Sequence, residues 1–222
     1  MTALSVAQIR EADRRCIEEL GIPGAVLMDN AGAAVFHEVK PGPVGVVCGK
    51  GNNGGDGFVV ARRALAAGCT TSVVLLCEPD EVRGDAALFM SAYRRLGGNV
   101  VIATNEAALK AAYASLGHCA TLVDAILGTG VRGEVRGFLR AAIEGWPREY
   151  TVAVDVPSGM DADTGAPCGS CVRADVTVTF QFSKRGFENP AAAAFLGRLV
   201  VADIGIPPVC ADDAAWRRLM HQ

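Results

Sequence analysis

Hydrophobic residues recur along the chain in two alternating patterns, and this alternation predicts the fold. Short apolar runs rich in β-branched residues, such as 44–48 and 151–156, show little polar alternation. Such runs are typical of parallel strands that are buried on both faces. Stretches with helical spacing separate most of these runs. We therefore expect an α/β protein with a Rossmann-like three-layer α/β/α fold and a mainly parallel central sheet.

The individual elements follow from the same patterns. Ser5 and Gln8 form a capping-box pattern that opens the first helix. No helical stretch is evident between the last strands, so we expect a mixed arrangement at that edge of the sheet. Strands are expected over 44–48, 72–77, 100–103, 121–127, 151–156, 176–182 and 198–204, and helices over 5–20, 25–39, 56–67, 81–96, 105–116 and 138–144.

Length and composition favour one globular domain. The 222 residues suit a single α/β unit with N-terminal helices in 1–40, a core in 44–207 and a short tail in 208–222. Half of the residues are hydrophobic, and the formal net charge is -3 without a long run of like charge, so nucleic-acid binding is not expected. No apolar run could span a bilayer and no secretory signal opens the chain, so we expect a cytoplasmic protein without a membrane partner.

The cysteines suggest no metal centre. Two of the eight, Cys48 and Cys77, lie in apolar strand-like runs and are expected in the core. Cys168 and Cys171 have C-x-x-C spacing, but a structural zinc site needs about four ligands and no second close pair supplies them. Two reduced thiols in a loop are the favoured interpretation, and a redox role is the weaker alternative.

Polar or glycine-rich loops follow three of the expected strands. They cover 49–57, 128–133 and 157–159. In an open parallel sheet, ligands bind outside the carboxyl ends of the strands. Three such loops therefore predict one binding site at this edge of the sheet.

The first loop carries more than a turn requires. Gly49, Gly51 and Gly54 have the spacing G-x-G-x-x-G, a weak signal on its own, which would also suit a tight strand-to-helix turn. Two asparagines and Asp56 fill the loop, and such groups can bind a ligand's hydroxyls or a cation.

Two aspartates interrupt apolar strands. Asp124 and Asp155 each have apolar neighbours, where a carboxylate is costly to bury unless it is paired. Each could be a structural aspartate that binds loop amides, but two on neighbouring strands favour a shared site. Together with Asn53 and Ser158, Asp124 would offer oxygen donors from three loops. That set suits a hard cation, and its low charge favours a monovalent one.

Other polar residues are less informative. Lys184 follows the sixth strand and could face the same edge of the sheet or be an ordinary solvated charge. His37, His118 and His221 have no spacing that suggests metal binding or nucleophilic chemistry. The chain has no G-x-S-x-G pattern, which argues against hydrolysis by an activated serine.

These motifs resemble those of the NAD(P)H-hydrate epimerases, the stand-alone form of the N-terminal domain of bifunctional hydrate-repair proteins. The resemblance extends from about 5 to 207, and its most specific part is the G-N-N-G-G-D-G core over 51–57. Departures are few: Lys50 stands where many relatives have proline, Asp29 where many have glutamate, and the stretch 39–44 is short. Further matching segments are 27–32, 123–130, 135–137, 154–165 and 202–207.

The resemblance implies a substrate, a cation and partners. The substrate is the hydrated dinucleotide NADHX or NADPHX, and one potassium ion per subunit is expected at Asn53, Asp124 and Ser158. A homodimer is expected by analogy, and the dehydration step is expected of a separate dehydratase. The substrate-binding residues implied by the family pattern are Asn52, Asn53, Gly54, Gly55, Asp56, Gly128, Thr129, Gly130, Val131, Arg132, Gly133, Glu134 and Asp155.

The implied reaction interconverts the R and S epimers of the hydrate. Hydration places a hydroxyl on C6 of the nicotinamide ring, beside the ring nitrogen, so loss of that hydroxyl gives an iminium stabilised by the nitrogen. Return of water to the other face inverts the centre. An acid and a base are required, and one carboxyl group can alternate between the two roles. We expect Asp155 to do so, with Lys184 as the second catalytic candidate.

Two other functions remain open. An NAD(P)-dependent oxidoreductase would share the glycine-rich turn, and Glu78 could bind a ribose, but the chain leaves little room for a substrate domain. A non-catalytic scaffold of the same fold is the other alternative, and the presence of Asp155 and of the N-N-G-G-D residues disfavours it.

Overall fold

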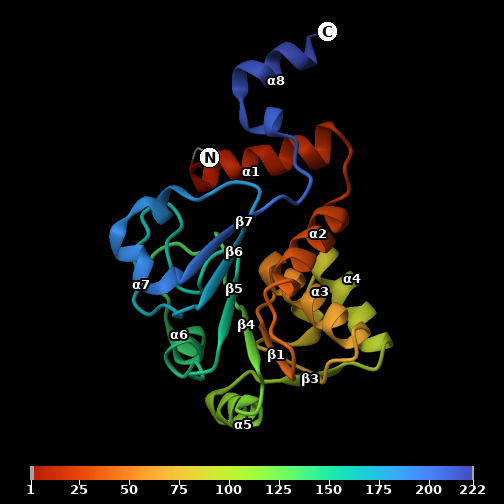
Figure 1. The fold of residues 1–222 in the computed structure, drawn as a ribbon, viewed down its shortest axis with the longest axis vertical. Coiled ribbons are helices and arrows are strands. Elements are labelled where there is room, and N and C mark those ends of the chain that lie inside the picture. Colours follow the sequence, from red (N-terminus) through yellow and green to blue (C-terminus); the bar gives the residue numbers. More distant parts are fainter. Residues whose placement is uncertain (1–2, 222) are drawn as a thin grey trace.

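A single parallel sheet organises the computed structural model, which describes residues 3–221. Its strand order is β3-β2-β1-β4-β5-β6-β7, and every neighbouring pair is parallel (Figure 1). The strands are β1 (Val44–Cys48), β2 (Thr71–Leu75), β3 (Asn99–Ile102), β4 (Thr121–Ala125), β5 (Thr151–Val154), β6 (Val176–Phe180) and β7 (Arg198–Ala202).

Helices cover both faces of the sheet, as the sequence predicts. Helices α2, α3 and α4 pack on one face, and α5, α6 and α7 lie on the other (Figure 1). The helices are α1 (Val6–Arg14), α2 (Gly24–Phe36), α3 (Asn52–Ala66), α4 (Gly84–Arg95), α5 (Glu106–Leu116), α6 (Gly137–Glu144), α7 (Ala193–Leu196) and α8 (Asp213–Met220). A π-helical turn, η1 (Arg15–Glu19), continues α1, and 3-10 turns occur at η2 (Pro79–Glu81), η3 (Arg185–Glu188), η4 (Pro190–Ala192) and η5 (Pro208–Ala211).

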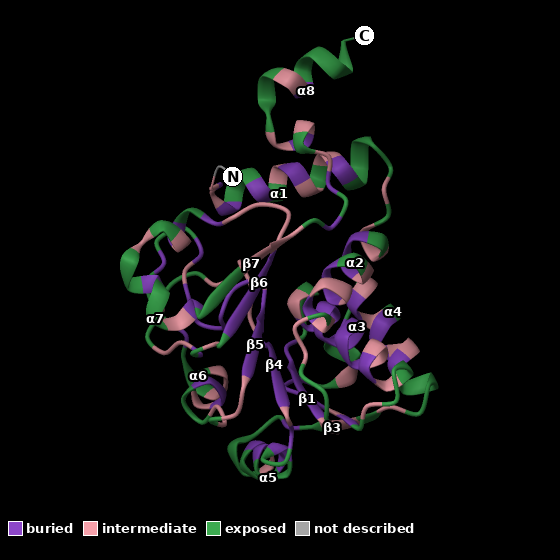
Figure 2. Ribbon diagram, viewed as in Figure 1, coloured by how far each residue is buried: buried purple, intermediate pink, exposed green. Residues whose placement is uncertain are grey.

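The central strands are buried on both faces. Every residue of β1, β4 and β5 is buried, and Figure 2 shows these strands inside the helical layers. Along β1, Val46 packs toward α3 and α4, whereas Val47 packs toward α5. Cys48 and Cys77 are core residues, as predicted. Within residues 3–221, no helix is long and apolar enough to cross a membrane.

The structure corrects two local predictions. The edge formed by β6 and β7 is parallel rather than mixed, because η3, η4 and α7 provide the crossover that a parallel connection requires. Helix α3 begins at Asn52 rather than Asp56, so the N-N-G-G-D residues occupy its first turns and not a loop. Only 49–51 remains as the turn after β1.

The N-terminal segment is anchored across the carboxyl ends of the strands. Ser5 caps α1 with the predicted capping box, in which the Gln8 N–H donates to Ser5 Oγ at 3.3 Å. The Val6 N–H donates to Asp163 Oδ1 at 2.8 Å, and Leu4 forms a parallel bridge with Lys184. These contacts fix α1 above the loops that the sequence analysis assigns to the site.

Candidate functional site

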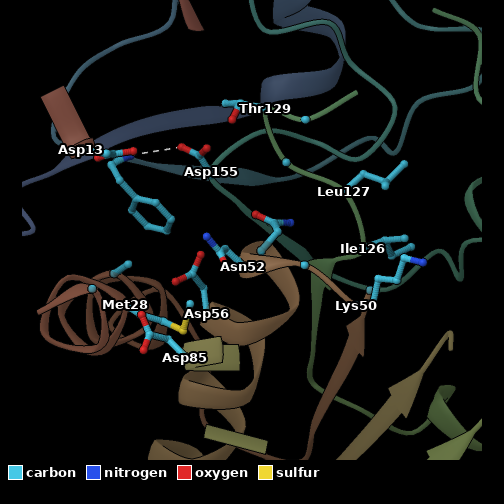
Figure 3. A pocket seen from close by; sticks show the side chains of 18 of the residues that line it. Asp13, Met28, Lys50, Asn52, Asp56, Asp85, Ile126, Leu127, Thr129 and Asp155 are labelled. Carbon is cyan, nitrogen blue, oxygen red and sulfur yellow. Dashed lines mark hydrogen bonds between the residues drawn. The ribbon is translucent and has the colours of Figure 1, made fainter. Parts of the chain in front are cut away.

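A cavity of about 710 Å³ opens where the strand order reverses, between β1 and β4. This switch point is where α/β sheets bind ligands, and the volume lies within the range of small-molecule sites. The cavity is bounded by α1, the first turns of α2 and α3, the ends of β2 and β5, and the loop after β4 (Figure 3).

Helix α3 presents its N-terminus to this cavity. Gly51 is its N-cap and supplies no side-chain cap, so the first N–H groups of the helix remain available to an anion. Asn52 and Asn53 line the cavity. Asn53 Nδ2 is buried without a hydrogen-bond partner among the residues described. An anionic ligand with further acceptors would satisfy these donors.

Gly54 and Gly55 do not line the cavity but bring α3 close to its neighbours. A Cβ at Gly54 would lie 2.0 Å from the carbonyl oxygen of Gly49, and one at Gly55 would lie 2.7 Å from Met28 Sδ. The two glycines therefore let the helix start immediately beside the end of β1. Within the predicted binding motif, these glycines allow the backbone of α3 to lie close to Gly49 and Met28.

Asp155 follows β5 and lies at the opposite side of the cavity. Its φ of 64° is in the left-handed region, which a non-glycine residue adopts rarely. Three donors converge on its Oδ1: the Thr179 hydroxyl at 3.0 Å, the Phe180 N–H at 3.4 Å and the ammonium of Lys184. No donor within residues 3–221 contacts Oδ2, so that oxygen is left for a ligand.

Lys184 lies behind Asp155 rather than on the cavity wall. Its side chain is 1% exposed and forms an ion pair with the Asp155 carboxylate, whose side chain is 14% exposed. Lys184 is therefore neither a solvated charge nor a residue at the cavity surface, which are the two alternatives that the sequence leaves open. Its position suits it to orient Asp155.

Asp124 and Ser158 form a buried pair below the cavity. The Ser158 N–H donates to Asp124 Oδ2 at 2.8 Å, and the Ser158 hydroxyl contacts Oδ1. Asp124 is 0% exposed, and burial raises its pKa to about 6 although hydrogen bonds from Ser158 and Ile126 lower it. No basic side chain in the described part of the chain forms an ion pair with Asp124.

These residues fit the expected monovalent cation. The Ser158 hydroxyl accepts from the Leu127 N–H at 2.9 Å, which joins the loop after β4 to the loop after β5. A Cβ at Gly128 would lie 3.0 Å from Asn53 Oδ1, so the Asn53 side chain borders the same loop. One buried carboxylate and neutral oxygens are a donor set that suits a singly charged ion.

The loop after β4 contributes only its first part to the cavity. Gly128, Thr129 and Gly130 line the wall. The rest of the predicted segment lies elsewhere: Val131 packs with apolar residues around Val135, Arg132 and Gly133 are exposed, and Glu134 pairs with Arg136 at 3.0 Å and with Arg140 at 3.5 Å.

Besides Asp155, four carboxyl groups within residues 3–221 line the cavity, and the sequence predicts a role only for Asp56: they are Asp13, Asp56, Glu81 and Asp85. Asp56 is predicted and lines the wall; burial, followed by the charges of Asp155 and Asp13, raises its pKa well above the usual range. Asp13 was not singled out. Burial and then the Asp155 charge raise the pKa of Asp13 to about 6. The signal available was an acidic residue within the apolar periodicity of the first helix.

The C-x-x-C pair has no part in the cavity. Cys168 and Cys171 are free thiols in the connection between β5 and β6. Among residues 3–221, no three His, Cys, Asp or Glu side chains are grouped to hold a metal. The Cys168 N–H donates to Gly159 O at 2.7 Å, and the Val135 N–H donates to Cys168 O at 2.8 Å, so this backbone supports the turn after Asp155.

Comparisons with known proteins show the family and the fold of this chain. Residues 24–186 match the family described as YjeF-related protein N-terminus. The chain is 42% identical over 217 residues to a bifunctional NAD(P)H-hydrate repair enzyme of Moorella thermoacetica, covering 93% of this chain and 41% of that protein. It is 40% identical over 204 residues to an NAD(P)H-hydrate epimerase of Pirellula staleyi, covering 89% of this chain and 90% of that protein.

The chain spans about two fifths of the length of the bifunctional relatives that it matches. A crystal structure of the yeast protein YNL200c has the same fold, with a TM-score of 0.72 at 23% identity, covering 84% of this chain and 83% of that one.

Proposed function

The chain belongs to the family of YjeF-related protein N-termini, and we propose that it is an NAD(P)H-hydrate epimerase, an isomerase that interconverts the R and S epimers of the hydrated nicotinamide dinucleotides. The observation that carries the proposal is the position of Asp155. One carboxylate oxygen is held by three donors, and the other remains available in a cavity of dinucleotide size.

The cavity offers complementary groups for a dinucleotide. The N-terminus of α3 would bind the pyrophosphate through its first N–H groups. Asn52 would add an amide at the same turn. Burial raises the pKa of Asp56 well above its usual range and so favours the protonated carboxyl group, which would donate a hydrogen bond to a ligand oxygen. In this arrangement the nicotinamide end would lie toward Asp155.

Asp155 would transfer the proton that the reaction requires. The C6 hydroxyl leaves as water when it accepts a proton, and the lone pair of the ring nitrogen forms the iminium. Attack of water on the opposite face releases a proton and restores the hemiaminal. Asp155 Oδ2 is suited to exchange a proton at this carbon, because Oδ1 is already saturated with donors. Lys184 then acts as a positioning residue.

Asn53, Asp124 and Ser158 would hold a potassium ion. When bound, the ion would supply a positive charge that compensates the buried Asp124 carboxylate and holds together the loops after β1, β4 and β5. The chain's own contribution is the positioning of those loops, because Ser158 already joins two of them through Leu127. The identity of the ion, a homodimeric assembly and a cytoplasmic location stay predictions.

Potassium is expected to stabilise the folded protein. At a concentration ten times its dissociation constant, a ligand specific to the folded state adds about 1.4 kcal/mol. In a protein of this size, that raises the thermal midpoint by about 4 °C. The measurement compares melting in potassium chloride and in lithium chloride at equal ionic strength.

Two variants complete the potassium experiment. Asp124→Asn should melt at the same temperature in both salts, because it lacks the anionic donor. The control Asp80→Asn changes an exposed aspartate outside the cavity and should keep the full shift. Equal midpoints in both salts for the unaltered protein would contradict the assignment.

Epimerase activity can be tested directly. The purified protein is mixed with the R epimer of NADHX and a dehydratase that accepts only the S epimer. We expect the R epimer to be consumed at least tenfold faster than in a parallel sample with heat-denatured protein. If consumption only matches spontaneous epimerisation, the proposed function fails. Intact NADH incubated alone should remain unchanged, which separates the epimerase from an oxidoreductase.

A further inference from the structure

One face of the N-terminal helix forms part of the cavity wall. Arg10, Asp13 and Ile17 follow each other at spacings of three and four residues, and all three line the cavity. Residues at these spacings share one side of a helix. Figure 3 shows Asp13 and Asp155 at the same end of the cavity, on segments that are far apart in the sequence.

The backbone around Asp13 is held from both sides. Ala12 and Cys16 are fully buried against residues near the C-terminus, including Trp216. Arg15 donates to Cys210 O at 3.0 Å and forms an ion pair with Asp213 at 2.6 Å. These contacts hold helix α1 in place, so the fold determines the position of Asp13 beside the cavity.

The carboxyl group of Asp13 has no structural task within the described residues. It is partly buried, yet no hydrogen bond or ion pair within residues 3–221 involves its side chain. Burial of a carboxyl group without a partner costs free energy. Carboxyl groups buried in this way are common at catalytic sites, where the reaction uses their shifted pKa.

We propose that Asp13 is a second catalytic carboxyl group, which exchanges a proton at C6 of the nicotinamide hydrate on the face opposite to Asp155. The inference rests on the proposed function and deepens it, because it replaces one alternating group by an acid and a base on two elements. Asp13 comes from α1 and Asp155 from the end of β5, so two different elements present the two carboxyl groups to the same cavity.

The two carboxyl groups give a balanced reaction. Protonated Asp13 transfers its proton to the C6 hydroxyl, the C–O bond breaks, and its electron pair leaves with the oxygen as water. The lone pair of the ring nitrogen forms the C=N bond of the iminium. Water then attacks C6 from the other face, its proton goes to Asp155, and the C=N electrons return to nitrogen. The reverse reaction exchanges the roles, and solvent restores the starting protonation.

The charges around Asp13 suit this division of roles. Burial, followed by the charge of Asp155, raises the pKa of Asp13 to about 6, while Lys184 opposes the rise. Asp155 is instead held by the Lys184 ammonium. The other charged side chains that line the cavity within residues 3–221 are Arg10, Lys50, Asp56, Glu81 and Asp85. The raised pKa of Asp13 thus suits it to carry the proton that the leaving hydroxyl accepts.

Asp13→Asn is expected to lower kcat for epimerisation about a hundredfold with little change in KM, because it removes a proton donor without removing volume. Small carboxylic acids such as formate should partly restore the activity of Asp13→Ala, which a structural role would not predict. The matched control is Glu18→Gln, which neutralises an exposed acidic residue in η1 outside the cavity and should retain wild-type kcat.

Stability provides the second measurement. The folded state raises the pKa of Asp13, so ionisation of Asp13 destabilises the folded state at pH 7 but not at pH 4, where the group is neutral. Asp13→Asn should therefore melt several degrees higher than wild type at pH 7, with the difference largely lost at pH 4. A variant that is more stable but inactive cannot be inactive through misfolding.

The outcomes separate the inference from the proposed function. If wild type epimerises the hydrate and Asp13→Asn keeps near-normal kcat, Asp13 is not a catalytic group. If Asp13→Asn is inactive but also less stable at pH 7, without rescue of Asp13→Ala by formate, the residue is structural and the inference is overturned. If wild type itself lacks activity, the proposed function is what fails.

Discussion

Replacing Asp155 by asparagine is expected to lower kcat for epimerisation by about a thousandfold, within the range that a proton-transferring side chain contributes. Asparagine keeps the shape of the side chain but cannot take up the proton of the incoming water. It also tolerates the left-handed backbone at φ 64°, where most other residues would be strained. The measurement is the rate of conversion of the R epimer in the presence of an S-specific dehydratase.

The control must account for the buried lysine. Asp155→Asn leaves the Lys184 ammonium, which is 1% exposed, without its counterion, and breaking a buried pair costs about 3–5 kcal/mol. The double variant Asp155→Asn, Lys184→Met removes the unpaired charge and should recover stability without recovering activity. Near-normal turnover in a folded Asp155→Asn protein would show that Asp155 is not the proton-transferring group.

The sequence predicts the elements of this fold better than their contacts. Apolar runs located the strands because burial on both faces selects β-branched residues over a short length. The loops after β1, β4 and β5 were placed at one edge because parallel strands share their carboxyl ends. Cavity-lining residues such as Asn52, Thr129 and Asp155 can therefore be predicted from the sequence.

The start of α3 shows what local reasoning misses. Consecutive glycines are poor helix formers, so local propensity predicts a turn over the N-N-G-G-D segment. In the structure it is helical because Gly54 and Gly55 pack directly on Gly49 and Met28. That packing decides the conformation, and no local pattern in the sequence encodes it.

The roles of Asp13 and Lys184 at the site are not evident from the sequence, for a related reason. Helical periodicity predicts the first helix but does not indicate which of its polar residues face a cavity. After burial, the charge of Asp155 is what raises the pKa of Asp13. Asp155 is more than a hundred residues away, and only the tertiary fold brings the two residues together. The same is true of Lys184, whose burial becomes explicable once its ion pair with Asp155 is known.

Gly54→Ala should lower the free energy of unfolding by about 3 kcal/mol, even though alanine in a helix interior normally gains about 1 kcal/mol over glycine. The added Cβ would lie 2.0 Å from the Gly49 carbonyl oxygen and 2.9 Å from its carbonyl carbon. Both atoms belong to the backbone at the end of β1, so no side-chain rotation relieves the overlap. Urea denaturation measures the change.

The matched control is Gly51→Ala, one turn earlier on the same segment. A Cβ at Gly51 meets no atom within 4 Å, and its φ of −89° suits alanine, so the change should stay within about 1 kcal/mol. The displacement caused by Gly54→Ala moves the helix N-terminus away from the cavity, so its folded fraction should bind NADH more weakly than wild type. Equal stability of wild type and Gly54→Ala would mean that α3 does not approach the end of β1 as closely as the structure shows.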